Sequence, residues 1–413
     1  MGKDLYEIGQ LPPIGEVPAQ MHAQLVRPDR FGEPEVAIVD EVIDVPEIGP
    51  HDALVAVMAA GVNYNNVWAA RGIPVDVTKG QARWDEPTDF HIVGSDASGI
   101  VYAVGSEVTN VAVGDRVVVH AGQWNEDDPW VRAGKDPGLA PTFRVWGYDS
   151  CWGSFAQFSK VQAHQCLPKA PHLTWEEAAA PTLTGSTAYR MLFGWPPHTV
   201  EPGDVVLVWG ASGGLGSLAV QLVANAGGRA VAVVGSDEKG EYATTLGAVG
   251  YINRTAFDHW GVPPAWDSPE WKNWFGGAKA FGKAIWDVLG DKVSPKIVFE
   301  HPGQDTIPTS IFVADRGGMV VICAGTTGYD TMVDVRYLWF MQKRYQGSHL
   351  FNDEQASAFN DLVVDGKIQT TLGATYPYAD TGTAHQLMGE GKLPEGNVSV
   401  LVNAPREGLT DLP

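Results

Sequence analysis

Apolar and polar positions divide the chain into two regions with different periods. Over roughly the first 170 residues, short apolar runs such as residues 54–60 alternate with turns marked by Gly and Asp, which predicts a β-rich region. From about residue 203, apolar strands alternate with helical stretches; the strands lie in "GDVVLVWG", "RAVAVVG", "VGYIN", "KIVFEHPG", "GGMVVICAG" and "YQGSHLFN". This alternation predicts an α/β region with a parallel, doubly wound sheet.

The two patterns predict a domain that is interrupted by another. Residues 1–185 form the first part of a β-rich catalytic domain, 186–350 a nucleotide-binding domain, and 351–413 return to the first. An insertion at about 254–295 breaks the alternation of strands and helices. It could cap a site, pack a subunit interface or extend the core. Its tryptophans are Trp260, Trp266, Trp271, Trp274 and Trp286.

The net charge of the chain limits the classes of molecule that it can bind. Lys and Arg number 28 against 49 Asp and Glu, a formal net charge of −21, so the surface repels nucleic acid and anionic lipid. No apolar run reaches the roughly 18 residues of a membrane span. Three cysteines suit a reducing compartment, and the first residues predict no signal peptide. We expect a cytoplasmic protein with no nucleic-acid or membrane partner.

The stretch "VVLVWGASGGLGSLAVQL" carries the strongest motif. A buried strand ends at Gly210, and a glycine-rich turn then opens a helix, where free N–H groups can hold a pyrophosphate. A glycine-rich turn without a ligand is the alternative, but the placement inside a βαβ unit favours a dinucleotide. The predicted cofactor-binding residues are Gly210, Ser212, Gly213, Gly214, Leu215, Gly216, Ser236, Lys239 and Cys323.

The tip of the second strand of this region favours NADPH over NADH. NAD-binding proteins usually carry an acidic residue there, whereas this chain has Gly235 and Ser236, with Lys239 nearby. Small and basic groups leave room for an additional phosphate. Asp237 and Glu238 follow closely and argue for NADH.

The stretch "AAGVNYNNVWAARG" places Asn63, Asn65 and Asn66 directly after an apolar strand. Asparagine is disfavoured in strands and helix interiors, because its amide competes with the backbone for hydrogen bonds. The amides either form a turn or helix cap, or they serve a ligand.

In this order of domains the chain resembles the medium-chain dehydrogenase/reductase superfamily, which implies a GroES-like catalytic domain and a Rossmann domain. Zinc-dependent members carry a cysteine and a "GHE" histidine, where this chain has Asn63 and, in "GSDASG", Ser95. Neutral amides are poor zinc ligands. We therefore expect no metal, and chemistry on an activated C=C bond.

Several motifs resemble the crotonyl-CoA carboxylase/reductase family. They are "VNYNNVW", "HIVGSDASG", "VWGYDSCWGSFAQF", "LTWEEAAAPTLTGSTAYR", "VWGASGGLGS", "VFEHPG" and "RYLWFMQKRYQGSH", in order along the chain. The resemblance implies that NADPH reduces an enoyl-CoA and that the resulting enolate attacks carbon dioxide. It also implies a homo-oligomer, a tetramer in relatives of this kind.

The family's carbon dioxide pocket holds an Asn, a Phe-Glu pair and a His, which fall on Asn65, Tyr148, Asp149 and His349. Tyr148 adds a hydroxyl and Asp149 is one methylene shorter, so carboxylation is expected to be incomplete. Without the resemblance, His349 reads as a structural histidine, Tyr148 as a packed aromatic and Asp149 as a turn residue.

Two further readings stay open. Arg336 and Tyr337 lie in a basic cluster that suits the phosphates of coenzyme A, although a solvated helix face explains its neighbours Lys343 and Arg344 equally well. The alternatives to a carboxylase are a plain NADPH-dependent enoyl-CoA reductase and a catalytically silent nucleotide-binding protein.

Overall fold

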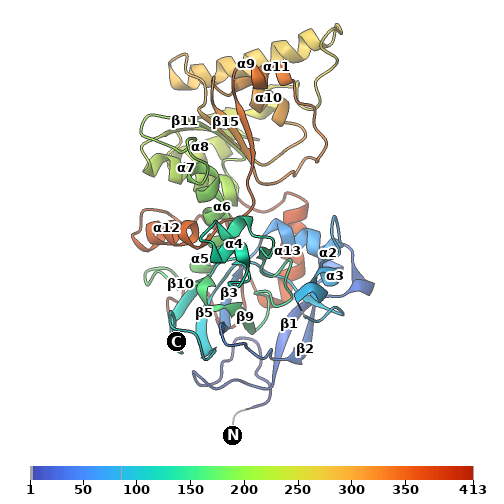
Figure 1. Cartoon of the computed structure of the whole chain (residues 1–413), viewed down its shortest axis with the longest axis vertical. Coiled ribbons are helices and arrows are strands. Elements are labelled where there is room, and N and C mark those ends of the chain that lie inside the picture. The colour runs from blue at the N-terminus through green and yellow to red at the C-terminus, as the bar shows by residue number, and fades with distance from the viewer. Residues whose placement is uncertain (1–2, 85, 413) are drawn as a thin grey trace. The chain divides into compact units, whose positions relative to one another are not determined.

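The computed structural model describes residues 3–84 and 86–412 and divides into two compact units (Figure 1). The β-rich unit comprises Met1–Leu183 and Leu350–Pro413, and the parallel-sheet unit comprises Thr184–His349. The predicted boundaries at 185/186 and 350/351 lie within two residues of these limits. None of the helices described is both long and apolar enough to cross a membrane.

The β-rich unit is built on a seven-stranded sheet with the order β10–β6–β5–β3–β18–β17, and β9 pairs with β3. The central strand β3 (Asp52–Gly61) is buried at every position after Asp52, as its apolar sequence predicts. The late strand β18 pairs antiparallel with β3, so the chain returns to this unit as predicted. The other strands are β5 (Ala97–Val104), β6 (Arg116–Val119), β9 (Phe158–Gln162), β10 (Cys166–Pro168), β17 (Leu372–Tyr376) and β18 (Asn397–Leu401).

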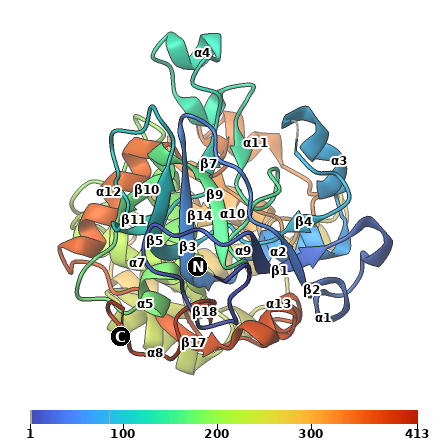
Figure 2. The ribbon, with the colours of Figure 1, turned by 90° about the horizontal axis from the view of Figure 1, so that it is seen from below.

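Smaller elements complete this unit. Helices α1, α2 and α13 pack on one another beside the sheet β2–β1–β4 (Figure 2). The strands are β1 (Gln20–Val26), β2 (Val39–Asp44), β4 (His91–Ile92), β7 (Gly122–Gln123) and β8 (Arg144–Val145). The helices are α1 (Pro34–Ala37), α2 (Tyr64–Arg71), α3 (Val77–Gln81), α4 (Pro129–Arg132), α5 (Trp175–Ala179), α12 (Asp353–Val364) and α13 (Thr381–Gly389), with short 3-10 turns that include η2 (Ala82–Trp84) and η4 (Ala163–Gln165).

The parallel-sheet unit confirms the predicted doubly wound sheet. Its six strands are all parallel, in the order β13–β12–β11–β14–β15–β16. They are β11 (Val205–Trp209), β12 (Arg229–Val234), β13 (Gly250–Asn253), β14 (Ile297–Glu300), β15 (Met319–Ile322) and β16 (Arg344–Gly347). The helices are α6 (Thr182–Phe193), which begins in the other unit, α7 (Gly214–Asn225), α8 (Asp237–Thr245), α9 (Trp271–Leu289), α10 (Ile307–Val313) and α11 (Val335–Trp339), with the turn η5 (Arg254–Ala256).

Helices α7 and α8 cover one face of the parallel sheet, and α9, α10 and α11 gather on the other (Figure 1). The predicted insertion supplies α9, which contributes to the core: Phe281 stacks on Trp209, and Trp260 meets Trp209 edge to face at 5.4 Å. Trp274 is also buried, whereas Trp266 is 66% exposed. The insertion therefore extends the core and also leaves an aromatic surface.

Candidate active site

The three asparagines of the opening of α2 all bind one short segment, Gly94–Asp96. Asn63 occupies the N-cap position of α2, but its side chain makes no capping hydrogen bond. Each amide instead reaches a different residue of the segment. The pairs are Asn63 Nδ2 to Asp96 Oδ2 at 3.1 Å, Asn65 Nδ2 to Ser95 Oγ at 2.8 Å, and Gly94 N to Asn66 Oδ1 at 3.2 Å. The asparagines thus hold the start of α2 against the residues that precede β5. A turn or a helix cap alone therefore does not describe the role of these amides.

Two of these partners are fully buried. Ser95 and Asp96 have no exposed surface, and burial raises the pKa of Asp96 well above its usual value. The second oxygen of Asp96 accepts the backbone N–H of Leu183 at 2.8 Å. Asn63 and Ser95 present an amide and a hydroxyl to each other's neighbours, and both groups are poor zinc ligands.

A tight turn at 145–149 lies against the same segment. Gly147 has φ +69°, and a Cβ at this residue would approach the carbonyl oxygen of Gly94 to 1.8 Å. His91 ties this turn to α3, because its ring nitrogens lie 3.0 Å from Gly147 O and 2.6 Å from Gln81 Oε1. Burial lowers the pKa of His91 to about 4, so the ring is neutral at pH 7. The turn that carries Tyr148 and Asp149 is therefore rigidly attached beside Gly94.

Asp149 makes two hydrogen bonds within its own turn. Its Oδ2 accepts the backbone N–H of Val145 at 2.8 Å, and its N–H donates to Val145 O at 2.7 Å. Tyr148 is partly buried against the apolar core of the unit. The carboxylate thus stabilises the turn while it lines a cavity.

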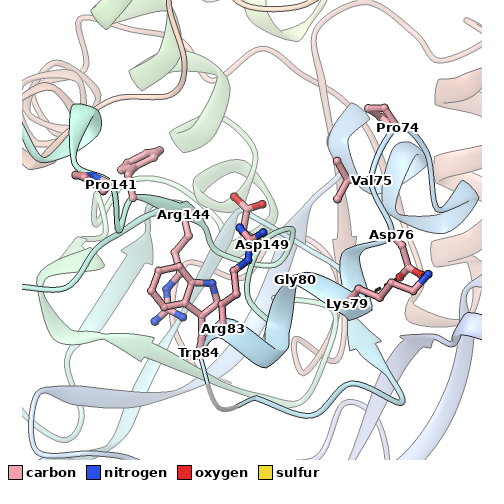
Figure 3. Close-up of a pocket in the computed structure, with 11 residues that line it drawn as sticks. Pro74, Val75, Asp76, Lys79, Gly80, Arg83, Trp84, Pro141, Arg144 and Asp149 are labelled. Atoms are coloured by element: carbon pink, nitrogen blue, oxygen red, sulfur yellow. Dashed lines mark hydrogen bonds and ion pairs between the residues drawn. The ribbon is translucent and has the colours of Figure 1, made fainter.

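That cavity has a volume of about 500 Å³ and lies between α3, η2 and the loop 141–149 (Figure 3). Asp149, Arg83, Trp84 and Arg144 gather along one part of it. The Arg144 guanidinium lies 4.5 Å from the ring of Trp84. The cavity is large enough for part of an organic substrate.

The glycine motif has the predicted strand–turn–helix setting. Gly210 directly follows β11 with φ +58°, and a Cβ there would meet Nε2 of His301 at 2.3 Å. At Gly216 a Cβ would meet the carbonyl oxygen of Gly210 at 2.3 Å, so glycine allows the helix to pack closely on the strand. Gly213 is the N-cap of α7, and a Cβ there would meet Gly210 O at an ordinary contact distance of 3.6 Å. The turn therefore leaves room for a pyrophosphate at the free N–H groups of Gly214 and its neighbours.

The tip of β12 carries Ser236 and Lys239, which the sequence predicts as ligands of a ribose phosphate, and the structure adds Arg254. Ser236 is the N-cap of α8, and its Oγ accepts the N–H of Lys239. Asp237 is occupied, since its Oδ1 accepts Nδ2 of Asn253 at 3.1 Å. Arg254, which the sequence reading missed, is exposed, and its Nε would lie 3.9 Å from a Cβ at Gly235. The parallel pairing of β12 with β13 brings it there.

Cys323 follows β15 and is half-buried. Burial raises its pKa to about 12, and the nearby Glu300 contributes in the same direction. Burial likewise raises the pKa of Glu300 to about 7, although it accepts hydrogen bonds from Thr306 Oγ1 at 2.5 Å and Ser310 Oγ at 2.6 Å. These groups lie where β14 and β15 end, at the same edge of the sheet as the glycine turn.

Arg336 and Tyr337 differ in their surroundings. Arg336 lines a mostly apolar cavity of about 460 Å³ between the insertion and α11, with its guanidinium 5.3 Å from the ring of Trp266. It pairs with Asp334 at 2.6 Å. Tyr337 instead packs edge to face on Phe312 at 5.0 Å in the core. Arg336 thus lines the cavity while Asp334 pairs with its guanidinium, and Tyr337 is mainly a packing residue.

His349 lies in the parallel-sheet unit, two residues after β16, and its side chain is exposed within the described structure. Its neighbour Ser348 accepts the indole N–H of Trp195 at 3.2 Å. The other three predicted pocket residues lie in the β-rich unit. Of these, Tyr148 and Asp149 lie in one turn. Asn65 binds Ser95, and the adjacent Gly94 lies against Gly147 of that turn.

His120 and His164 both contact Asp353, which lies about 190 or more positions later in the chain. Asp353 Oδ1 lies 2.9 Å from His120 Nε2 and 3.0 Å from His164 Nδ1. The N–H of Gly122 donates to His120 Nδ1, so neutral His120 carries its proton on Nε2, facing the carboxylate. That proton makes Nε2 a donor to Asp353 rather than a metal ligand. We interpret the cluster as the anchor of α12.

Comparison with known proteins gives the family of the chain. The alcohol dehydrogenase GroES-like domain model matches residues 49–171, and the zinc-binding dehydrogenase model matches 214–365. A crotonyl-CoA carboxylase/reductase from Cereibacter sphaeroides is 51% identical over 407 residues, which are 98% of this chain and 93% of that protein.

Two solved structures extend the similarity. The crotonyl-CoA carboxylase/reductase AntE in complex with NADP has a TM-score of 0.94 at 52% identity and covers 98% of this chain and 100% of its own. The 2-octenoyl-CoA carboxylase reductase CinF with NADP and 2-octenoyl-CoA has a TM-score of 0.87 at 36% identity, covering 96% and 90%. The chain therefore belongs to the crotonyl-CoA carboxylase/reductase family, within the medium-chain dehydrogenase/reductase superfamily.

Proposed function

We propose that this protein catalyses the NADPH-dependent reductive carboxylation of a 2-enoyl-CoA thioester. The observation that carries the proposal is the fixed arrangement of Asn65 and the turn of Tyr148 and Asp149 around Gly94–Asp96, in a chain of this family. NADPH, when bound, supplies a hydride to the β-carbon of the enoyl group. The electron pair of the C=C bond then resides on the α-carbon as an enolate, which forms a new C–C bond to carbon dioxide and yields a carboxylate.

The residues present fit the nicotinamide dinucleotide. Gly210 and Gly216 remove side chains from the turn, and the start of α7 offers N–H groups to the pyrophosphate. We assign the 2′-phosphate to Ser236, Lys239 and Arg254, which lie together at the tip of β12, where Asp237 Oδ1 is engaged by the amide of Asn253. This assignment supports NADPH rather than NADH.

Asn65 and His349 are proposed to donate N–H groups to the oxygens of carbon dioxide, which is neutral and accepts only weak hydrogen bonds. Tyr148 and Asp149 are proposed to control water in the pocket. If water or another acid protonates the α-carbon first, the product is the plainly reduced thioester. A difference of about 1.4 kcal/mol between the two routes changes the product ratio about tenfold.

One observation favours the second candidate, a plain enoyl-CoA reductase. Asp149 Oδ2 already accepts the N–H of Val145, so the short carboxylate has less capacity to hold an ordered water. We therefore propose that carboxylation is incomplete, with reduction as a side reaction. A silent nucleotide-binding protein is the third candidate.

The test is NADPH oxidation, followed at 340 nm with crotonyl-CoA, with and without saturating bicarbonate and carbonic anhydrase. Mass spectrometry of the thioesters separates the carboxylated from the reduced product. We expect turnover in both conditions and a mixed product in bicarbonate. Reduced product alone supports the plain reductase, and no turnover with crotonyl-CoA, acryloyl-CoA or 2-octenoyl-CoA supports the silent protein.

Arg336 is proposed to hold a phosphate of coenzyme A at the mouth of its aromatic cavity, with Tyr337 packed behind it. The same unit exposes a set of large apolar side chains that suits a homo-oligomer, which we propose to be a tetramer. They are Trp266, Tyr329, Met332, Val335, Trp339 and Phe340. Light scattering of the purified protein tests this assembly. The free cysteines agree with a proposed cytoplasmic location.

A further inference from the structure

The strongest unexplained feature of the β-rich unit is the environment of the Asn65 amide. One N–H of Nδ2 donates to Ser95 Oγ at 2.8 Å, in good hydrogen-bonding geometry. Oδ1 is buried, and among the described residues no group donates a hydrogen bond to it. The second N–H of Nδ2 likewise has no acceptor among the described residues, so the amide has one fixed N–H and one N–H that can serve a ligand, since buried polar atoms are normally paired.

We propose that Ser95 is a positioning residue for Asn65 and thereby sets the ratio of carboxylated to reduced product. This inference rests on the proposed function. Ser95 is fully buried and lies between Gly94 and Asp96, both of which are bound to the flanking asparagines. Its hydroxyl therefore has a fixed place, and it holds the amide plane of Asn65. The remaining N–H of Asn65 is then directed consistently at one position.

The physical reason is the weakness of carbon dioxide as an acceptor. A rotating amide spends only part of its time with an N–H directed at the ligand, and the enolate can be protonated during the rest. Hydride transfer does not require this N–H, so loss of Ser95 should change the fate of the enolate and leave its formation unchanged. A preorganised donor is effective because it needs no reorganisation when charge develops.

The experiment compares Ser95→Ala with the full-length wild type in the assay with crotonyl-CoA and saturating bicarbonate. We expect the ratio of carboxylated to reduced product to fall about tenfold, the equivalent of one hydrogen bond of about 1.4 kcal/mol. The rate of NADPH oxidation should stay within about twofold, an allowance of about 0.4 kcal/mol. Asn65→Leu should lower the ratio at least as far, and Ser95→Ala added to Asn65→Leu should have no further effect.

Ser98→Ala is the matched control. Ser98 is an equally buried hydroxyl on β5, and its Oγ donates to the backbone oxygen of Trp175 at 2.7 Å, away from the asparagines. Its removal should lower stability without changing the product ratio. If Ser95→Ala does not fold, Ser95→Cys keeps the size and replaces the hydroxyl by a weaker acceptor, and it should lower the ratio by a smaller factor.

Two outcomes separate this inference from the proposed function. If the wild type makes no carboxylated product at any bicarbonate concentration, the proposed carboxylation fails. If the wild type carboxylates and Ser95→Ala, or Ser95→Cys where the alanine variant does not fold, keeps the wild-type ratio, the positioning role is wrong. An equal fall of both products would also overturn it, since that result indicates general damage to the site.

Discussion

The side-chain nitrogen of Asn63 lies 3.1 Å from Oδ2 of Asp96, and both side chains are buried. The other oxygen of Asp96 accepts the N–H of Leu183. One carboxylate therefore joins the start of α2 to the start of α6. We predict that Asp96→Ala lowers the free energy of unfolding by about 2–5 kcal/mol, because two buried donors lose their acceptor.

Urea denaturation followed by tryptophan fluorescence measures this loss. Asp127→Ala serves as the control, because Asp127 forms an exposed ion pair with Arg132 that should contribute little. A double-mutant cycle with Asn63→Ala should give a coupling energy above about 0.5 kcal/mol. Strictly additive losses would show that Asn63 and Asp96 act independently.

Because Asp149 already accepts the N–H of Val145, we predict that a longer side chain at this position raises the fraction of carboxylated product. Asp149→Glu adds one methylene, which lets one oxygen keep the N–H of Val145 while the other reaches farther into the cavity. We expect the fraction of plainly reduced product in bicarbonate to fall severalfold, on the order of 1 kcal/mol. Mass spectrometry of the thioesters measures the fraction. An unchanged fraction in both Asp149→Glu and Tyr148→Phe would contradict the explanation of incomplete carboxylation.

Arg254 predicts the cofactor preference. A charged hydrogen bond to a phosphate contributes about 1.5–3 kcal/mol, so Arg254→Gln should raise the KM for NADPH about 10- to 100-fold. The KM for NADH, which lacks that phosphate, should stay nearly constant. Lys283→Gln on α9 removes another exposed positive charge, one that pairs with Asp287, and controls for the general field. Equal effects on both cofactors would exclude a contact with the 2′-phosphate.

Glu300 predicts a pH dependence of stability in the parallel-sheet unit. Burial raises its pKa to about 7 in the folded state, whereas the unfolded value is 4.5. Between these values the folded state binds more protons than the unfolded state, so stability falls as pH rises from about 4.5 to 7 and stays reduced above that. The shift corresponds to about 2–4 kcal/mol.

Glu300→Gln removes this titration while it keeps one donor and one acceptor. Urea midpoints at pH 5 and pH 8 should therefore decline less in the variant than in the wild type. Glu241→Gln, at an exposed position of α8, should decline as the wild type does. A wild-type slope in Glu300→Gln would mean that another group governs stability in this range.

The sequence by itself determined the sheet of the parallel-sheet unit. Apolar runs such as Val205–Trp209 and Arg229–Val234 are buried on both faces, and that pattern depends only on neighbours in the chain. The glycine turn was equally readable, because the strand before it and the helix after it are local. The capping box of Thr174 and Glu177 is local in the same way, because the two residues are three positions apart in the chain.

Contacts between distant segments were decided only by the tertiary structure. Asn65 donates a hydrogen bond to Ser95, thirty positions later in the chain. The pairing of β12 with β13 places Arg254 beside Gly235. His120 pairs with Asp353, which is far from it in sequence. The identities of these residues are visible in the sequence, but their partners are not. A side chain's hydrogen bonds depend on which backbones the packed sheets bring within 3 Å, and local periodicity carries no information about that distance.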